Sequence, residues 1–179
     1  MTNVTTYYLE MLDPQALRPK PSRDGTALVR VDPPMPELNR FFYATVGGDW
    51  HWIDRLPWTW KQWSDYLNRP ELHTWMLTVH GIPAGYFELE AQPGGHVEIA
   101  YFGLLPSFVS KGLGGYMLTC AIEKAWAMNA RRVWVHTCSL DHPQALQNYL
   151  ARGFTKYKEE ITSIEVESQP IGPWPGSRA

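Results

Sequence analysis

Apolar residues recur along this chain with two different periods, and the change between them separates strands from helices. Short runs rich in β-branched and aromatic residues, bounded by Gly and Pro, are typical of strands. Apolar residues three and four positions apart are typical of helices. Strands are predicted over residues 5–12, 27–31, 74–79, 84–90, 96–104 and 133–137, with one or two more over 154–166. Helices are predicted over residues 37–46, 59–68, 112–129 and 143–151.

The connections between these segments indicate how they combine. Gly81 and the pair Gly94 and Gly95 join three consecutive strands by tight turns, which predicts an antiparallel meander. Helices and strands alternate after the meander, as in units that pair strands in parallel. The sequence therefore predicts an α/β fold of the mixed α+β kind, in which helices pack on the faces of a mixed, mostly antiparallel sheet.

Length and composition indicate one soluble domain spanning residues 1–179. Lys and Arg number 16 against 18 Asp and Glu, so the basic excess typical of nucleic-acid-binding proteins is missing. The two cysteines, Cys120 and Cys138, fit neither a disulfide framework nor a zinc site, so we expect a cytoplasmic protein with no metal. No stretch approaches the roughly 20 apolar residues of a membrane span, so no membrane partner is expected. The sequence does not distinguish a monomer from a homodimer.

A glycine-rich loop, Ser110 to Tyr116, lies between a predicted strand and a predicted helix that begins near Gly112. Backbone N–H groups at a helix start and the positive end of the helix dipole favour a bound anion there. The dinucleotide fingerprint needs a third glycine where Met117 stands, and the triphosphate loop needs a Gly-Lys-Ser/Thr ending that is absent. The loop therefore predicts a different phosphate site, with a tight connection lacking a ligand as the alternative.

Residues Val109 to Gly114 resemble the pyrophosphate loop of the GNAT superfamily of N-acetyltransferases, Gln/Arg-x-x-Gly-x-Gly/Ala, with Val109 in place of Gln or Arg. Residues His142 to Phe154 resemble a second motif of that superfamily, Asn-x-x-Ala-x-x-x-Tyr-x-x-x-Gly-Phe, with His142 in place of Asn. The resemblance is good over residues 75–154. It implies a GNAT-like fold that binds acetyl-coenzyme A (acetyl-CoA).

The resemblance also implies how the domain is divided and where the cofactor binds. Residues 1–73 would form a variable acceptor-side part, residues 74–166 the acetyl-CoA-binding core, and residues 167–179 an extended Pro-rich tail. The pantetheine arm would enter between strands 96–104 and 133–137, with a backbone N–H near Leu104 or Leu105 polarising the carbonyl. The cofactor-binding residues so implied are Leu104, Leu105, Val109, Ser110, Lys111, Gly112, Leu113, Gly114, Gly115, Tyr116, His142 and Tyr149.

Acetyl transfer to an amine needs a base for the ammonium proton and an acid for the departing thiolate. The resemblance points to Glu98, on the strand before the loop, as the catalytic base. Strand alternation would put Glu98 on one face with Ala100 and Phe102, and Tyr101 on the other face. A solvated strand glutamate is the alternative.

Tyr149 occupies the position that the family uses for the catalytic acid. A phenol with a pKa near 10 is matched to a thiolate of similar basicity. The alternative is a helix tyrosine that packs on the sheet. Cys138 is not proposed as a nucleophile, because direct attack by the amine needs no acyl-enzyme.

Five tryptophans crowd residues 50–63, together with Asp49 and Asp54. Aromatic faces attract alkylammonium groups, so this segment predicts an enclosed acceptor pocket, although the rings could instead fill the core. The predicted substrate-binding residues are Asp49, Trp50, Trp52, Glu88 and His136. The sequence thus predicts acetyl transfer, within a ternary complex, to a primary amine of a small molecule. A protein or peptide N-acetyltransferase and a non-catalytic acyl-CoA-binding module are the alternatives.

Overall fold

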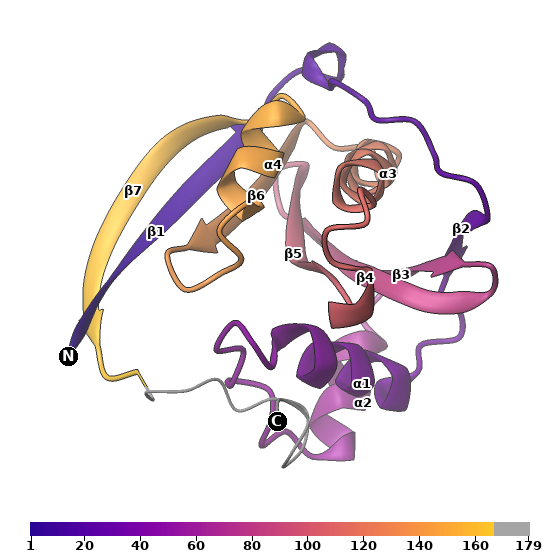
Figure 1. Cartoon of the computed structure of the whole chain (residues 1–179), viewed down its shortest axis with the longest axis horizontal. Helices are drawn as coiled ribbons and strands as arrows, with labels where there is room; N and C mark the ends of the chain where they lie inside the picture. Colours follow the sequence, from indigo (N-terminus) through magenta and orange to yellow (C-terminus); the bar gives the residue numbers. More distant parts are fainter. Residues whose placement is uncertain (167–179) are drawn as a thin grey trace.

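We analysed a computed structural model of the chain, which describes residues 1–166 (Figure 1). The strands are β1 (Thr2–Met11), β2 (Thr26–Arg30), β3 (Leu72–Val79), β4 (Ile82–Gln92), β5 (His96–Leu104), β6 (Arg132–Cys138) and β7 (Thr155–Ile164). The helices are α1 (Pro36–Gly47), α2 (Trp60–Leu67), α3 (Gly114–Trp126) and α4 (Ala145–Ala151), with short 3₁₀ turns at Pro14–Ala16 and Pro106–Phe108.

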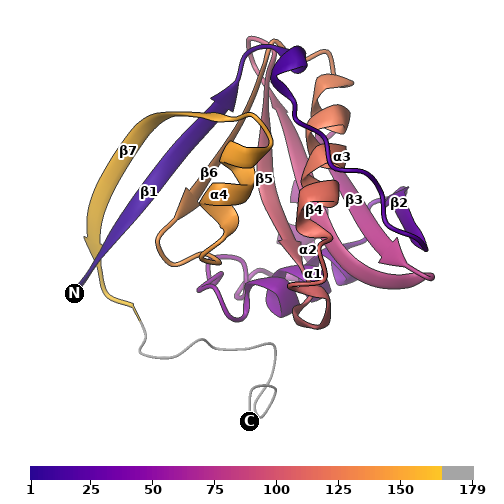
Figure 2. The same ribbon diagram turned by 45° about the horizontal axis from the view of Figure 1, so that its top comes forward.

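Within the described residues, the strands form one seven-stranded sheet in the order β2-β3-β4-β5-β6-β1-β7. Strands β5 and β6 pair in parallel, and the other neighbours are antiparallel. Helices α1 and α2 lie on one side of this sheet, and α3 and α4 lie on the other (Figures 1 and 2). This arrangement confirms the predicted fold class.

Most predicted elements differ from the observed ones by only a few residues. Thr59 caps α2 as its side chain accepts a hydrogen bond from the Gln62 N–H, and Gln62 reciprocates. Helix α3 is shorter than predicted and begins at Gly114, because Gly112 has a φ of +75°, outside the helical region. Residues 154–166 contain a single strand. The predicted tail, 167–179, lies outside the described residues.

The position of β1 differs from the expected division of the chain at residue 73. β1 lies between β6 and β7 and pairs with both, from Thr6↔Cys138 to Met11↔Val133 on one side and from Thr2↔Ile164 on the other. Its Leu9 and Met11 join the core between the sheet and α3. The first strand therefore lies beside strands that come from the last third of the described residues.

Strand β5 also departs from the regular alternation that was predicted. Glu88 pairs with Tyr101 but the next residue, Leu89, pairs with Ile99, so Ala100 forms a β-bulge. Because of this extra residue, the side chains after Ala100 point to the opposite side of the sheet from the one that regular alternation predicts. Tyr101 therefore packs toward α1 and α2, on the side that Glu98 also faces, and Phe102 packs with Ile99 toward α3. The prediction that Phe102 shares a face with Glu98 was wrong.

No helix within residues 1–166 is both long enough and apolar enough to cross a membrane.

Candidate active site

The central feature of the site is a gap between β5 and β6. These strands pair only from His96↔Arg132 to Glu98↔Trp134 and then separate. The bulge at Ala100 lies just where the pairing stops, and bulges bend the strand that carries them. A cavity of about 1650 Å³ opens in the gap, lined by both strands, the glycine loop, α4 and the segment at residues 50–55.

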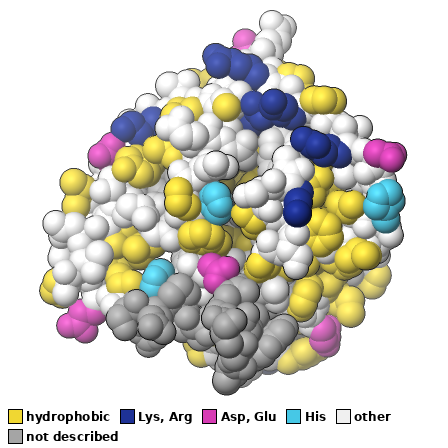
Figure 3. All heavy atoms as spheres, viewed as in Figure 1, with side chains coloured by type: hydrophobic (Ala, Val, Ile, Leu, Met, Phe, Trp, Pro, Cys, Tyr) yellow, Lys and Arg dark blue, Asp and Glu magenta, His cyan; other side chains and the backbone are white. Residues whose placement is uncertain are grey.

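The glycine loop presents backbone donors to this cavity. Ser110 and Gly112 adopt positive φ values of 61° and 75°, and α3 begins immediately afterwards without a side-chain cap on its N-terminus. The first N–H groups of a helix have no partner within the helix. Lys and Arg side chains gather over this part of the molecule (Figure 3). The loop is therefore suited to hold phosphate groups.

Most of the predicted cofactor residues line the cavity. Those that do are Leu104, Val109, Ser110, Gly112, Gly114, Gly115, His142 and Tyr149. The side chains of Leu105 and Leu113 are buried in the core instead, the Tyr116 hydroxyl interacts with Cys120, and Lys111 does not line the cavity either. The structure thus brings the loop and α4 together but leaves four of the expected side chains outside the cavity.

Leu104 and Leu105 were the two candidate N–H donors to the thioester carbonyl, and the N–H of Leu105 already has a partner. The Leu105 N–H donates to the Ala84 carbonyl at 2.8 Å. Successive N–H groups of a strand point to opposite sides, so that of Leu104 points away from β4, toward the gap. The expectation for Leu105 is corrected, and Leu104 remains the predicted donor.

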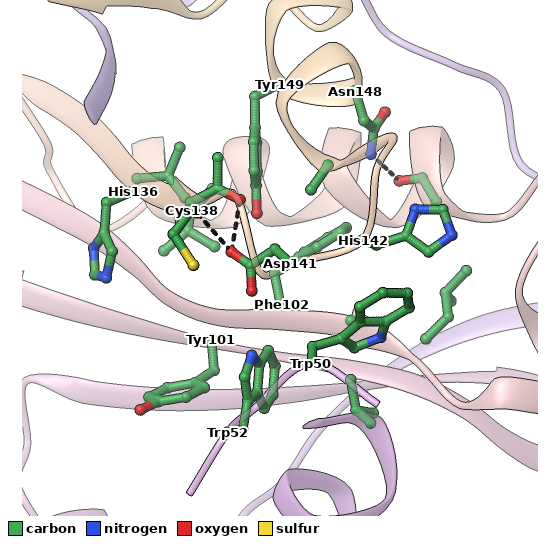
Figure 4. Close-up of a pocket in the computed structure, with 18 of the residues that line it drawn as sticks. Trp50, Trp52, Tyr101, Phe102, His136, Cys138, Asp141, His142, Asn148 and Tyr149 are labelled. Atoms are coloured by element: carbon green, nitrogen blue, oxygen red, sulfur yellow. Dashed lines mark hydrogen bonds between the residues drawn. The ribbon is translucent and has the colours of Figure 1, made fainter. Parts of the chain in front are cut away.

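Tyr149 points from α4 into the cavity (Figure 4). Its ring lies 6.2 Å from that of Phe102, and Asp141 lies across from it. Burial raises the pKa of Tyr149 well above 10, and the charge of Asp141 adds to this rise. The phenol is therefore protonated at neutral pH, and it is a weaker acid than a solvent-exposed phenol.

Glu98 and His136 face each other across the start of the gap. The Glu98 carboxylate accepts a hydrogen bond from Gln92 Nε2 at 2.9 Å and lies 3.4 Å from His136 Nδ1. The interaction with Glu98 raises the pKa of His136 above its usual value, although burial opposes this. Both residues line the cavity, and their roles as base and acceptor contact stay predictions.

The five tryptophans of residues 50–63 lie in different surroundings, and Trp60 is 64% exposed. Trp50 and Trp52 line the cavity, where the Trp50 ring lies 5.1 Å from His142 and the Trp52 ring lies 5.0 Å from Tyr101 (Figure 4). Trp63 is buried in the core instead. Asp49 is not among the residues that line the cavity.

Glu88 is fully buried and does not line the cavity. Its carboxylate accepts hydrogen bonds from Asn39 Nδ2 and Arg55 Nη1, both at 2.9 Å, and from the Tyr66 hydroxyl at 3.1 Å. All three donors come from α1, α2 and the segment between them. The structure therefore corrects the expectation that Glu88 contacts the acceptor.

Arg55 occupies the kind of aromatic cage that was predicted for a substrate cation. Its guanidinium carbon lies 4.0 Å from the ring centroid of Tyr101 and 4.1 Å from that of Tyr66, with Trp58 at 4.9 Å. Cations are attracted to aromatic faces at such distances. Part of the aromatic cluster thus binds the protein's own arginine.

Several residues near the loop were not predicted from the sequence. Asn148 Nδ2 donates to the Gly114 carbonyl at 3.3 Å and so joins α4 to the start of α3 (Figure 4). Lys20, Arg23 and Arg152 line the cavity beside the loop. The only signal for Asn148 and Arg152 was their place within the second motif. Lys20 and Arg23 lie in a Pro-rich connection that gave no signal.

Comparisons with known proteins identify the family. A sequence model described as the Acetyltransferase (GNAT) family matches residues 34–154. No curated protein gives a significant match.

Solved structures share the fold at low sequence identity. A GCN5-related N-acetyltransferase from Kribbella flavida is 19% identical with a TM-score of 0.63, over 85% of this chain and 54% of that one. An aminoglycoside acetyltransferase from an uncultured soil metagenomic sample, in complex with trehalose, is 11% identical with a TM-score of 0.63, over 80% and 96%. A spermidine N-acetyltransferase from Vibrio cholerae, in complex with CoA and spermine, is 12% identical with a TM-score of 0.63, over 76% and 84%.

This chain therefore spans about half the length of the Kribbella protein. At these identities the structural likeness establishes the fold alone, whereas the family model matches well over half of the chain. The chain belongs to the GNAT family of acetyltransferases.

Proposed function

We propose that the protein transfers the acetyl group of acetyl-CoA to a primary amine of a small molecule. The observation that carries this proposal is that one cavity is lined by Glu98, Tyr149 and the glycine loop. The acid, the base and the phosphate site come from separate elements, and the separation of β5 from β6 gives them a common space.

The residues around the gap fit acetyl-CoA. The uncapped start of α3 and the left-handed backbone at Gly112 form a cradle of N–H groups for the pyrophosphate. The N–H of Leu104, which faces the gap, is placed to polarise a carbonyl between the two strands. When bound, acetyl-CoA supplies a thioester whose carbonyl carbon is open to attack by an amine.

Glu98 and Tyr149 then handle the protons. Glu98 takes the proton of the ammonium group, directly or through a water, so that the amine nitrogen can form its bond to the carbonyl carbon. As the carbon–sulfur bond breaks, Tyr149 gives its phenolic proton to the sulfur. The nitrogen loses its second proton once it is bonded to the carbonyl carbon, and this proton returns to the Tyr149 phenolate directly or through water. Glu98 releases its proton to solvent, so each transfer yields the amide, the free thiol of CoA and one proton, and both residues return to their starting states.

The acceptor end of the cavity favours a small amine. Trp50, Trp52 and Tyr101 offer ring faces there, and Glu98 adds a negative charge. Neighbours of similar fold include a spermidine N-acetyltransferase and an aminoglycoside acetyltransferase, whose named substrates carry several amines. We therefore propose a small polyamine or amino sugar as the class of acceptor.

The direct test is to incubate the purified protein with acetyl-CoA and a panel of polyamines, aminoglycosides and lysine peptides. Release of free CoA and the mass of the product identify the acceptor. We expect Tyr149→Phe and Glu98→Gln each to slow transfer by about 10²–10⁴-fold, with acetyl-CoA affinity nearly unchanged. Binding of acetyl-CoA without transfer to any amine would favour the binding module, and transfer to peptides alone would favour a protein N-acetyltransferase.

A further inference from the structure

The connection between β1 and β2 crosses the start of α3 and is held there at three points. The Arg18 N–H donates to the Arg152 carbonyl at 3.0 Å, and the Lys20 N–H donates to Thr119 Oγ1 at 2.9 Å. Farther along, Arg23 Nε donates to the Gly112 carbonyl at 3.3 Å. These bonds place the side chains of Lys20 and Arg23 beside the glycine loop.

Arg152 reaches the same place from the end of α4. It is only 8% exposed, and it forms no ion pair with any residue in the described part of the chain. Its Nε has no hydrogen-bond partner, while Nη2 donates to the Ala151 carbonyl. A Cβ added to Gly115 would lie 2.5 Å from Arg152 Nη1 and 3.0 Å from Lys20 Cγ. Arg152 and Lys20 therefore lie against the first turn of α3.

A buried cation without a counter-ion is costly, and it is normally paired or neutralised by a ligand. Burial, reinforced by the nearby charge of Arg18, lowers the pKa of Arg152, as expected for a cation in an unfavourable site. A bound anion would relieve this cost. Arg152 lines the cavity together with Gly114 and Gly115, so an anion bound in the cavity can reach it.

The positive charge beside the loop exceeds what the pyrophosphate needs. The start of a helix acts as about half a positive charge, and its first N–H groups have no partner within the helix. Lys20, Arg23 and Arg152 add three full charges. Arg23 donates to the Gly112 carbonyl, so its guanidinium lies beside the loop. The three side chains therefore extend the positive region beyond the N–H groups of the loop itself. CoA carries one further phosphate, on its ribose.

We propose that Lys20, Arg23 and Arg152 form a second phosphate subsite beside the glycine loop, which binds the ribose 3′-phosphate of CoA. The subsite rests on the proposed use of acetyl-CoA and deepens it, because it makes the protein discriminate CoA from dephospho-CoA. Neither of the two sequence motifs contains Lys20 or Arg23.

The test is calorimetric binding of CoA and dephospho-CoA to the whole chain. The wild-type protein should bind CoA about 10- to 100-fold more tightly, as expected for charge-assisted hydrogen bonds to one phosphate. Arg23→Gln and Arg152→Gln should each reduce this preference by about tenfold or more, with dephospho-CoA affinity nearly unchanged. Lys124→Gln, which removes one positive charge from the last turn of α3, is the matched control and should keep the preference.

Equal binding of the two compounds by the wild-type protein would overturn the subsite. Equal weakening of both by Arg23→Gln would also overturn it and assign the cation to the pyrophosphate. Arg23 is exposed, so its variant remains informative even where Arg152→Gln fails to fold. If the wild-type protein bound neither compound, the proposed use of acetyl-CoA would fail together with the subsite, and that outcome is distinct from a lost preference.

Discussion

Two buried arginines lie on opposite sides of the sheet, and they differ in what surrounds them. Arg55 is 6% exposed and donates to Glu88 at 2.9 Å, whereas Arg152 is 8% exposed and has no carboxylate partner within residues 1–166. Burial opposes the charge of both. For Arg55 burial is the largest single effect, but the charge and hydrogen bond of Glu88 together with Tyr66 and Tyr101 outweigh it and raise the pKa. The pKa of Arg152 is instead lowered. The fold pairs the first arginine with a carboxylate, whereas the proposed subsite pairs the second with a phosphate.

The largest expected effect is on Arg55. Arg55→Ala leaves the carboxylate of Glu88 buried without its cation, which should cost about 3–5 kcal/mol of unfolding free energy. Arg152→Ala should change stability without ligand by about 1 kcal/mol or less. Urea denaturation of both variants measures the contrast. The double variant Arg55→Met with Glu88→Leu should recover much of the loss, because no unpaired charge remains. Equal losses in the two single variants would contradict the comparison.

Alanine substitutions of the aromatic residues around Arg55 should affect stability, whereas those of the aromatic residues at the cavity should affect KM. Trp63→Ala should cost about 3–5 kcal/mol of stability and impair both substrates together, since Trp63 is buried in the core. Trp50→Ala should instead raise KM for the amine, with KM for acetyl-CoA and the melting temperature nearly unchanged. A large fall in melting temperature for Trp50→Ala, with non-selective kinetics, would place Trp50 in the core group.

Ligand binding should stabilise the protein through Arg152 and not through Arg55. At a CoA concentration about 100 times Kd, the wild-type protein should gain about 2.7 kcal/mol of stability. Arg152→Gln should gain less at the same concentration, because its Kd is higher. Thermal denaturation with and without CoA measures both gains. The same gain in the two proteins would show that Arg152 does not contact the ligand.

The smallest effect concerns Glu98 and His136, a more exposed counterpart of the pair formed by Arg55 and Glu88. The pKa of folded His136 is raised by Glu98, so this stabilisation is complete below the unfolded pKa of about 6.5 and is lost as pH rises through the folded value. The His136 side chain is 47% exposed, so solvent screening should keep the effect below about 1 kcal/mol. Stability from pH 5 to 8 should fall more in the wild type than in Glu98→Gln. Parallel curves would contradict the assignment.

The parts of this protein that could be predicted depend on neighbours in the sequence. The cap at Thr59 needs only Gln62, three residues on, and the junction between the glycine loop and α3 needs only the residues on either side of it. The resemblance placed Tyr149 and Glu98 on the correct elements because both positions are counted from local motifs. Each of these features can be read within a short window.

The parts that could not be predicted depend on distant segments. Periodicity indicates which face of a strand is apolar, but it does not indicate that β1 lies between β6 and β7. The bulge at Ala100 follows from pairing with β4, and it reversed the expected faces. Charged side chains are rarely buried, so the sequence gives no reason to expect Arg152 in the interior. Its burial depends on the crossing of the connection at Lys20 and Arg23, which lies far away in the sequence.

The position of β1 also affects the order in which the protein can fold. Thr2 pairs with Ile164 and Met11 with Val133, so the sheet contains contacts between opposite ends of the chain. Such distant contacts require closure of a long loop and slow the folding rate. During synthesis the first strand emerges long before either of its partners. Its hydrogen-bonding edges must wait until β6 and β7 have been synthesised, so β1 enters the native sheet later than its place in the sequence suggests.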